Sequence, residues 1–511
     1  MSDWTAGYVA DIGYTYGYYQ ELNPLRARLA LNYHALVCPR FETACELGFG
    51  QGLSTNMHAA ASGTEWYGTD FNPSQAGFAQ ELARVSGNGA SLYDEAFAEF
   101  CNRPDLPDFD FIGLHGIWSW INDENRKLIV DFVRRKLKVG GVLYVSYNTL
   151  PGWATFAPMR HLMTQHSEVI GSEGRGIVSR IDGAIEFAEK LLATNPLFLK
   201  ANPLIIERIK KMRDQNRHYL AHEYFNRDWH PMHFSTMAGW LEEAKVGFAC
   251  SAHYLDFVDG VNLSVEQQQF LAEIPDMMLR QSTRDFMVNN QFRRDYWVKG
   301  ARRLTAREQT DALLEHRVIL QAHRPDVSLK VTSTRGEADM NKAIYEPILD
   351  CMANHEVRTL GEIAEAVESQ GVTRPQVIQA IVVLANNGSV ASVQDEEAIG
   401  SAQAATDKLN HHIISKADGS DELANLASPV IGGGTPANRF VQLFLAANKE
   451  GITGTEELAD FAWSRLRAVG QKLVVEGKSL DTDEENLQQL REYAERYVSK
   501  QEPIMRALRL K

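Results

Sequence analysis

Residues 43–52 read Thr-Ala-Cys-Glu-Leu-Gly-Phe-Gly-Gln-Gly, and this stretch decides how the first part of the chain folds. It ends an apolar run and then turns on three glycines at alternate positions, which are Gly48, Gly50 and Gly52. A second apolar run ends at Asp70, 24 positions after Glu46. Glycines accept a positive φ and let the backbone approach a ligand closely, and a carboxylate at the end of the next strand can bind a ribose. The pattern predicts a nucleotide-type cofactor site at the edge of a parallel sheet.

The spacing of the glycines separates two kinds of cofactor. The dinucleotide fingerprint G-x-G-x-x-G needs its third glycine for close packing of the helix on the strand. Counted from Gly48 and Gly50, that glycine belongs at position 53, where the chain has Leu53. A carboxylate, Glu46, also precedes the turn. These residues exclude the dinucleotide interpretation and leave either a different cofactor site or a turn with a purely structural role.

The pattern Glu46-x-Gly48-x-Gly50-x-Gly52 resembles the first motif of class I S-adenosylmethionine-dependent methyltransferases. Their cofactor has no pyrophosphate but carries a cationic sulfonium and an amino-acid end, so a carboxylate beside the turn is favourable. The resemblance implies that the glycines approach the amino-acid end of S-adenosyl-L-methionine and that Glu46 helps to hold its ammonium group. It also implies that Asp70, followed by Phe71, binds the ribose hydroxyls, and that S-adenosyl-L-homocysteine is the product.

Length, composition and charge limit the classes of protein to which the chain can belong. The chain has 511 residues, of which 44% are hydrophobic and 23% charged, as in an ordinary globular protein of two to four domains. The sequence has no apolar run near the ~20 residues of a membrane span, no signal-peptide pattern, and five scattered cysteines without metal-ligand spacing. We therefore expect a cytoplasmic protein with no bound metal. The net charge of −14 disfavours nucleic acid as a partner and is compatible with a basic protein substrate.

Short apolar runs alternate with helical patterns along the first part of the chain, which is typical of a doubly wound α/β sheet. The expected strands are 41–47, 65–70, 89–93, 109–114 and 142–147. Helical patterns over about 155–245 interrupt the alternation and indicate an insertion, after which strand-like composition returns. With the resemblance above, these patterns predict a Rossmann-like, seven-stranded methyltransferase domain over residues 1–325.

Three further segments follow this domain. Residues 326–340 are polar and unpatterned, which favours a linker. The order of helices and a final β-like run in 341–399 resembles a winged helix, and 400–511 has mainly helical patterns. A DNA-binding role for the winged-helix-like domain is disfavoured, because nine acidic residues face only three basic ones between positions 340 and 400.

The ends of the third and fourth strands carry the next candidates, since cofactors of class I methyltransferases also touch these ends. The third strand leads into Asp94-Glu95-Ala96, where either acid can accept a hydrogen bond from the adenine amino group, unless both are only surface charges. The fourth leads into His115 and two tryptophans, Trp118 and Trp120. These side chains can form an aromatic slot around the sulfonium, with Trp120 toward the substrate. The alternative is that both tryptophans are core residues.

The acceptor should enter beside the end of the fifth strand. Tyr147 and Asn148 lie at that end and Trp153 follows. We take Tyr147, Asn148 and His115 as candidate catalytic residues, and Trp153 as a further substrate contact. The tyrosines that precede the first strand are interpreted as a lid that contacts substrate, or else as ordinary packing residues; they are Tyr14, Tyr16, Tyr18 and Tyr19.

Longer blocks narrow the resemblance. Residues 115–120, 146–153 and 160–166 look like bacterial methyltransferases with a methyltransferase regulatory domain, and 219–225 with 284–294 resemble that domain itself. The family includes lysine methyltransferases that modify bacterial outer-membrane proteins. It implies a dimerisation region at about 155–245, which is compatible with a homodimer. Phe49 and Trp118 depart from the residues expected in relatives.

One other pair of residues resembles the start of a metal-binding motif. His222-Glu223 begins like the zinc-protease motif H-E-x-x-H, but position 226 is asparagine. The two residues are therefore interpreted as structural or interface residues rather than catalytic ones.

The favoured hypothesis is a methyltransferase that acts on lysine side chains of a protein. Its pocket should desolvate the lysine amine and lower the pKa of that group. Two alternatives stay open, an O- or N-methyltransferase of a small molecule or sugar, and a non-catalytic protein that binds S-adenosylmethionine.

Overall fold

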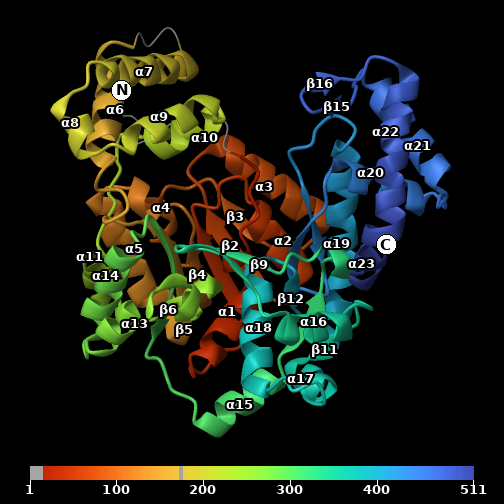
Figure 1. Cartoon of the computed structure of the whole chain (residues 1–511), viewed down its shortest axis with the longest axis horizontal. Coiled ribbons are helices and arrows are strands. Elements are labelled where there is room, and N and C mark those ends of the chain that lie inside the picture. The colour runs from red at the N-terminus through yellow and green to blue at the C-terminus, as the bar shows by residue number, and fades with distance from the viewer. Residues whose placement is uncertain (1–14, 172–175) are drawn as a thin grey trace.

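A seven-stranded sheet forms the centre of the molecule in the computed structural model, which describes residues 15–171 and 176–511 (Figure 1). The strand order is β3-β2-β1-β4-β5-β7-β6. The strands are β1 (Thr43–Leu47), β2 (Glu65–Thr69), β3 (Ser91–Tyr93), β4 (Phe109–Leu114), β5 (Leu137–Asn148), β6 (Val246–Ser251) and β7 (Phe292–Lys299). Strands β1 to β5 are parallel, and β7 lies antiparallel between β5 and β6. This arrangement confirms the predicted Rossmann-like sheet and its completion after the insertion.

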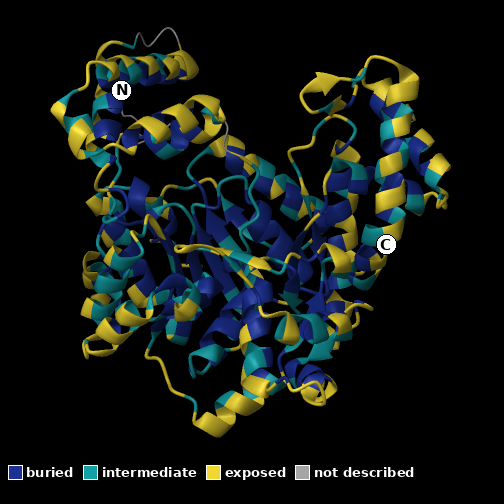
Figure 2. Cartoon of the chain, viewed as in Figure 1, coloured by how far each residue is buried: buried dark blue, intermediate teal, exposed yellow. Residues whose placement is uncertain are grey.

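Alternation along the strands separates two cores, because successive side chains of a strand point to opposite faces. Cys45 and Leu47 of β1 pack in one core with helices α5 and α11, whereas Ala44 packs in the other with α1. Figure 2 shows the buried sheet between these layers. The helices around the sheet are α1 (Pro24–Tyr33), α2 (Leu53–Ala61), α3 (Pro73–Ser86), α4 (Phe97–Phe100), α5 (Asp123–Lys136), α11 (Phe234–Glu242), α12 (Asp259–Asn262), α13 (Val265–Ala272), α14 (Met277–Met287) and α15 (Ala306–Leu314).

The insertion between β5 and β6 forms a helical lobe with its own core, at the upper left of Figure 1. Its helices are α6 (Ala157–Val169), α7 (Gly176–Ala193), α8 (Leu197–Ala201), α9 (Ile205–Asp214) and α10 (Arg217–Tyr224). The chain returns to the sheet at Met232, which forms a parallel bridge with Thr149 at the end of β5. The last helix of the lobe is thereby held close to the carboxyl edge of the sheet.

The middle of the chain differs from the expected linker and domain boundary. Residues 326–340 contain a β-hairpin of β9 (Lys330–Ser333) and β10 (Gly336–Asp339). Thr334 and Arg335 form its turn, and Gly336, which follows them, has a φ of 104°. Its strands are mostly exposed and lack the apolar alternation that reveals a strand in a sequence. Before it, β8 (Arg317–Leu320) pairs with β11 (Arg358–Thr359) and β12 (Val390–Ser392). The accompanying helices are α16 (Lys342–Cys351), α17 (Leu360–Glu368) and α18 (Arg374–Asn386).

The C-terminal part is mainly helical and packs on helices α2 and α3 beside the central sheet. Helix α19 (Glu396–Lys416) lies against α2 and α3, and Leu409 and Ile413 share a core with Leu53 and Met57. The remaining elements are β13 (Asn425–Ser428), β14 (Gly433–Pro436), α20 (Arg439–Lys449), α21 (Thr455–Ala468), β15 (Val474–Val475), β16 (Lys478–Ser479), α22 (Asp483–Arg496) and α23 (Glu502–Ala507). None of the helices in the described ranges has both the length and the apolar character that crossing a membrane requires.

Buried charges join β7 to β5. The Arg293 guanidinium lies 2.8 Å from Asp285 and 2.7 Å from Asp295, and all three side chains are buried. The Tyr147 hydroxyl donates a hydrogen bond of 3.0 Å to the second of these carboxylates. Removing one partner of such a group leaves the others charged and without compensation in a low-dielectric interior.

We therefore expect Arg293→Gln to lower the free energy of unfolding by about 3–5 kcal/mol, measured from urea-induced unfolding followed by tryptophan fluorescence. The matched control is Arg307→Gln, which removes an exposed ion pair of 3.7 Å with Asp311 and should change stability by less than about 1 kcal/mol. Equal stability of the two variants would show that the buried charges do not hold β7 in place.

Candidate active site

The turn after β1 has the backbone that its glycines predict. The φ angles of Gly48, Gly50 and Gly52 are 75°, 58° and 66°. A Cβ atom on Gly48 would lie 2.4 Å from Cδ1 of Ile117, and one on Gly52 would lie 2.5 Å from Cβ of Ala79. The left-handed conformation and the lack of space therefore both require glycine here.

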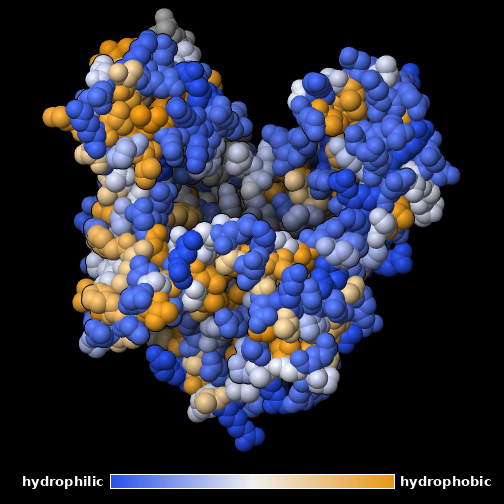
Figure 3. Space-filling view, in the orientation of Figure 1, coloured by the Kyte–Doolittle hydropathy of each residue, from blue (hydrophilic) through white to orange (hydrophobic). Residues whose placement is uncertain are grey.

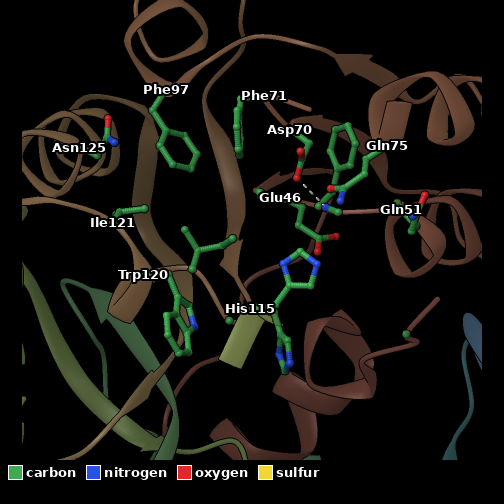
Figure 4. A pocket seen from close by; sticks show the side chains of 18 of the residues that line it. Glu46, Gln51, Asp70, Phe71, Gln75, Phe97, His115, Trp120, Ile121 and Asn125 are labelled. Atoms are coloured by element: carbon green, nitrogen blue, oxygen red, sulfur yellow. Dashed lines mark hydrogen bonds between the residues drawn. The ribbon is translucent and has the colours of Figure 1, made fainter. Parts of the chain in front are cut away.

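Asp70 is fixed at the end of β2 by backbone amides. The amide of Gly50 donates to Oδ2 at 2.8 Å (Figure 4), and the amide of Asn72 donates to Oδ1 at 3.0 Å. Burial raises the pKa of Asp70 to about 6, although the two amide hydrogen bonds oppose this rise. The carboxylate is thus oriented by the glycine turn itself.

Glu46 lies at the end of β1 and is almost completely buried. Burial raises the pKa of its carboxyl group to about 8; the hydrogen bond that Thr55 donates to Oε2 lowers it, and the nearby Asp70 raises it. At neutral pH the group is largely protonated, and a cation placed beside it would favour its ionised form.

These groups open into a cavity of about 150 Å³. Strand ends, the turn that follows β4, the N-terminal segment and helix α10 all contribute to its wall. Five carboxylates line it, and none of the described residues in its wall is a lysine or an arginine. The five are Glu46, Asp70, Glu95, Glu223 and Asp228.

Glu95, rather than Asp94, lines the cavity beside the end of β3. Its Oε1 accepts a hydrogen bond of 2.6 Å from Arg103, while Oε2 is buried without a hydrogen-bond partner among the described residues. Asp94 is exposed and lies outside the lining. Ala96 belongs to the lining, together with Phe71 and Phe97, whose rings lie at the same end of the pocket in Figure 4. An acceptor between aromatic rings is suited to a purine base.

His115 lies in the middle of the cavity wall and is covered by Tyr19. The two rings stack with centroids 3.7 Å apart, and Nδ1 of His115 lies 2.8 Å from the Tyr144 hydroxyl. Burial lowers the pKa of His115 to about 4, so its imidazole is neutral at pH 7. The histidine can therefore shape the pocket and form hydrogen bonds, but it holds no charge there.

Four predicted site residues are placed elsewhere. Trp118 is fully buried in the core, where its indole N–H points at the sulfur of Met232, 3.3 Å away. The hydroxyl of Tyr147 is committed to the buried charges of β7, and Trp153 packs in the core of the helical lobe. Asn148 is buried at the end of β5, outside the lining. Of the two tryptophans after β4, the one that lines the cavity is Trp120, and none of these four residues belongs to the lining.

Of the tyrosines predicted to form a lid, one described side chain lines the cavity. Tyr16 packs edge-on against Phe78, and Tyr18 lies against the glycines of the β14 hairpin and against His58. Tyr19 lines the cavity, whereas Tyr14 lies outside the described residues. The contacts of Tyr16 and Tyr18 agree with the packing alternative.

Helix α10 contributes residues that sequence analysis placed elsewhere. His222 and Glu223, interpreted as structural or interface residues, line the cavity together with Asp228. Burial raises the pKa of Glu223 to about 7. The sequence places these residues in a helical insertion, and nothing in its periodicity signals that the last helix reaches the sheet edge. Local spacing also missed further lining residues, which are Thr15, Gly17, Gln51, Gln75, Gly116, Ile117, Ile121, Asn122 and Asn125.

Comparisons with known proteins agree with this geometry. A family described as "predicted methyltransferase regulatory domain" matches residues 216–299. An uncharacterized protein of Synechocystis sp. is 40% identical over 510 residues, which cover 99% of each chain. The chain belongs to the same family as this Synechocystis protein, and it carries the methyltransferase regulatory domain at residues 216–299.

More distant relatives share this architecture. An uncharacterized protein of Rickettsia prowazekii is 24% identical over 349 residues, covering 64% of this chain and 57% of the relative. The structure of PKMT2 from Rickettsia typhi in complex with AdoHcy superposes with a TM-score of 0.71 at 16% identity, over 97% of this chain and 99% of the other. The fold is therefore shared along nearly the whole length, including the helical lobe and the C-terminal part.

The glycine turn gives a direct test of the cofactor site. Gly52→Ala forces a Cβ onto a left-handed residue, 2.5 Å from Ala79, and should weaken binding of S-adenosylhomocysteine at least about tenfold, since the conformation alone costs roughly 1–2 kcal/mol. Isothermal titration calorimetry measures the change. The control is Gly63→Ala, where nothing lies within 4 Å of the added atom. Unchanged binding by the Gly52 variant would remove the turn from the cofactor site.

Proposed function

We propose that this methyltransferase transfers the methyl group of S-adenosylmethionine to the side-chain amine of lysine in a protein. The observation that carries the proposal is the acidic lining of the cavity: five carboxyl groups in its wall, of which Glu46 ionises when a cation binds beside it, and no lysine or arginine among the described lining residues. Both the sulfonium cofactor and a lysine ammonium are cations, so the same wall favours both ligands. A phosphorylated small molecule or a nucleic acid would meet repulsion instead.

The shape of the molecule supports a macromolecular acceptor. Figure 3 shows a deep hollow, open to solvent, between the helical lobe and the C-terminal part (α19 to α23). A polypeptide lying there could send one long side chain into the cavity while its backbone stays outside. The net charge of −14 would speed the encounter with a basic segment. PKMT2 has the same fold and was solved in complex with AdoHcy, which supports the proposed cofactor.

The side chains around the cavity can align the reaction. When bound, the cofactor supplies a methyl group that is already activated by the sulfonium. Asp70 and Glu95 are held by backbone amides and by an arginine, so they can fix the two ends of an adenosine without moving. The rings of Tyr19 and Trp120 can attract an incoming cation and exclude water. Alignment and desolvation are the main contributions that a displacement of this kind needs from the protein.

Protonation of Glu46 should be linked to cofactor binding. Its pKa of about 8 in the free protein must fall when the cationic cofactor binds, so binding at pH 7 should release up to one proton. The affinity for S-adenosylmethionine should therefore decrease as the pH is lowered from about 7.5 to 6, by up to tenfold per pH unit. Calorimetry in phosphate and in Tris buffer gives the number of protons released.

Glu46→Gln should bind more weakly and release no proton, whereas Glu42→Gln, at the exposed start of β1, should behave as the wild type. If the Glu46 variant releases as many protons as the wild type, another group carries the linkage, and the assignment of Glu46 to the ammonium of the cofactor fails.

The acceptor class is tested by transfer of a labelled methyl group. The protein is incubated with S-adenosyl-L-[methyl-³H]methionine and a lysate of a Synechocystis strain that lacks the related gene, so that acceptor sites are unmodified. We expect tritium in the protein fraction and, after acid hydrolysis, in methylated lysine. Asp70→Asn, which removes a ribose ligand, gives the background.

Label that appears solely in small metabolites would contradict the lysine proposal and favour a small-molecule acceptor. Cofactor binding without label in any fraction would favour a binding protein without catalytic activity.

A further inference from the structure

Helix α10, which belongs to the helical lobe and not to the sheet, reaches the cofactor cavity with a carboxylate. Resting on the proposed lysine methyltransferase function, we propose that Glu223 receives the proton that the acceptor ammonium must lose before methyl transfer. The segment matched by the regulatory family begins at residue 216, one position before this helix, so the group lies within that segment. The active site would then be complete only with the lobe in place.

The end of α10 is fixed against the sheet. The amide of Met232 donates to the carbonyl of Asn148 at 3.0 Å, and the amide of His230 donates to the carbonyl of Ser119 at 2.8 Å. The buried Arg160 also donates to the carbonyl of Asn226, just after the helix. These bonds hold the irregular segment that follows α10 to the end of β5 and to the turn after β4, which keeps the helix close to this edge of the sheet.

The other carboxylates of the cavity already have partners. Glu46 accepts from Thr55, and Asp70 accepts from two backbone amides. Glu95 is paired with Arg103, and Asp228 lies 3.6 Å from His230. In the described part of the chain, Glu223 forms no hydrogen bond or ion pair. Its carboxylate is therefore the one that can meet an incoming ammonium without losing an existing partner.

The alternatives for holding this proton are poorly placed. His115 is neutral, because burial lowers its pKa to about 4, and an imidazole of that basicity does not keep a proton at neutral pH. The hydroxyl of Tyr147 points to the buried charges of β7. The pKa of Glu223, which burial raises to about 7, matches the pH at which a proton acceptor works best.

The step balances as follows. The N–H bond of the ammonium breaks, its electron pair stays on nitrogen, and the proton goes to a carboxylate oxygen of Glu223, which gives a neutral amine and a carboxylic acid. The amine then forms the N–C bond while the C–S bond breaks, with its electron pair leaving on sulfur. The products are S-adenosylhomocysteine and a methylammonium group. The carboxylic acid then returns its proton to water.

The test compares Glu223→Gln with the wild type in methyl transfer to the protein fraction of the lysate above, across about pH 6 to 9.5. In the pH–rate profile of the wild-type protein we expect the rate to fall below about pH 7, because Glu223 is protonated below its pKa; we call this fall the acidic limb. In the glutamine variant the rate at pH 7.5 should fall by about 10²–10⁴-fold, and the limb should move toward the pKa of the free amine, so that high pH partly rescues the reaction. A positioning or structural role would lower the rate without moving the limb.

Glu207→Gln, an exposed glutamate of the neighbouring helix α9, is the matched control and should change neither rate nor profile. Binding of S-adenosylhomocysteine, measured by calorimetry, should be unchanged in both variants and verifies folding. Glu223→Asp should keep the acidic limb with a lower rate. A Glu223→Gln protein with the rate and limb of the wild type would overturn the inference, and so would a reduced rate with an unmoved limb. Absence of transfer to protein by the wild type would instead overturn the proposed function itself.

Discussion

The hydrogen bond from the Gly50 amide to Asp70 is the contact on which the rest of the site depends. It forms because three residues of the turn adopt a positive φ, which directs a backbone N–H from the end of β1 toward the end of β2. The same close turn leaves Glu46 buried behind it, with Thr55 of the following helix as its hydrogen-bond donor. One local conformation thus places two desolvated carboxylates beside each other without any cation from the chain. The electrostatic cost of that arrangement is offset when a cationic ligand binds.

The regulatory segment is part of the catalytic unit. Residues 216–299 extend from the N-cap of α10 to the last residue of β7, so they include a helix that lines the cavity and both strands that complete the sheet. The buried ion pairs of Arg293 with Asp285 and Asp295 join β7 to the tyrosine of β5. A shift of this segment relative to the sheet would therefore displace these ion pairs and the tyrosine of β5, and with them the end of β5 beside the cavity. The C-terminal part has a similar connection on the opposite side, because α19 packs on the helix that follows the glycine turn.

Much of the fold, and the grouping of the glycine turn with Glu46 and Asp70 in one cavity wall, could be predicted from the sequence, because both depend on local patterns. The glycines, Glu46 and Asp70 lie within one strand–turn–helix–strand unit, and their spacing determines their geometry. Trp118 and Trp120 show where this reasoning ends: two residues apart in a tight turn, one enters the core and the other the cavity, and no period distinguishes them. Glu223 is harder still, since its place depends on how a lobe of more than fifty intervening residues packs back on the sheet. The exposed β9–β10 hairpin was missed for a different reason, namely that it has no apolar face to reveal it.

The division of the cavity between sheet and lobe has a mechanistic consequence. Carboxylates that hold a cofactor need fixed partners, so that their geometry does not change when the ligand arrives, and Asp70 and Glu95 have such partners. A carboxylate that exchanges a proton in each cycle needs the reverse: few partners, and a pKa close to the working pH. Glu223 meets both of these needs, because it has no hydrogen-bond partner among the described residues and burial raises its pKa to about 7. Under the proposed function, the strand ends bind the cofactor and the lobe receives the acceptor. This separation would let one sheet keep its cofactor site while the acceptor specificity changes with the helices above it.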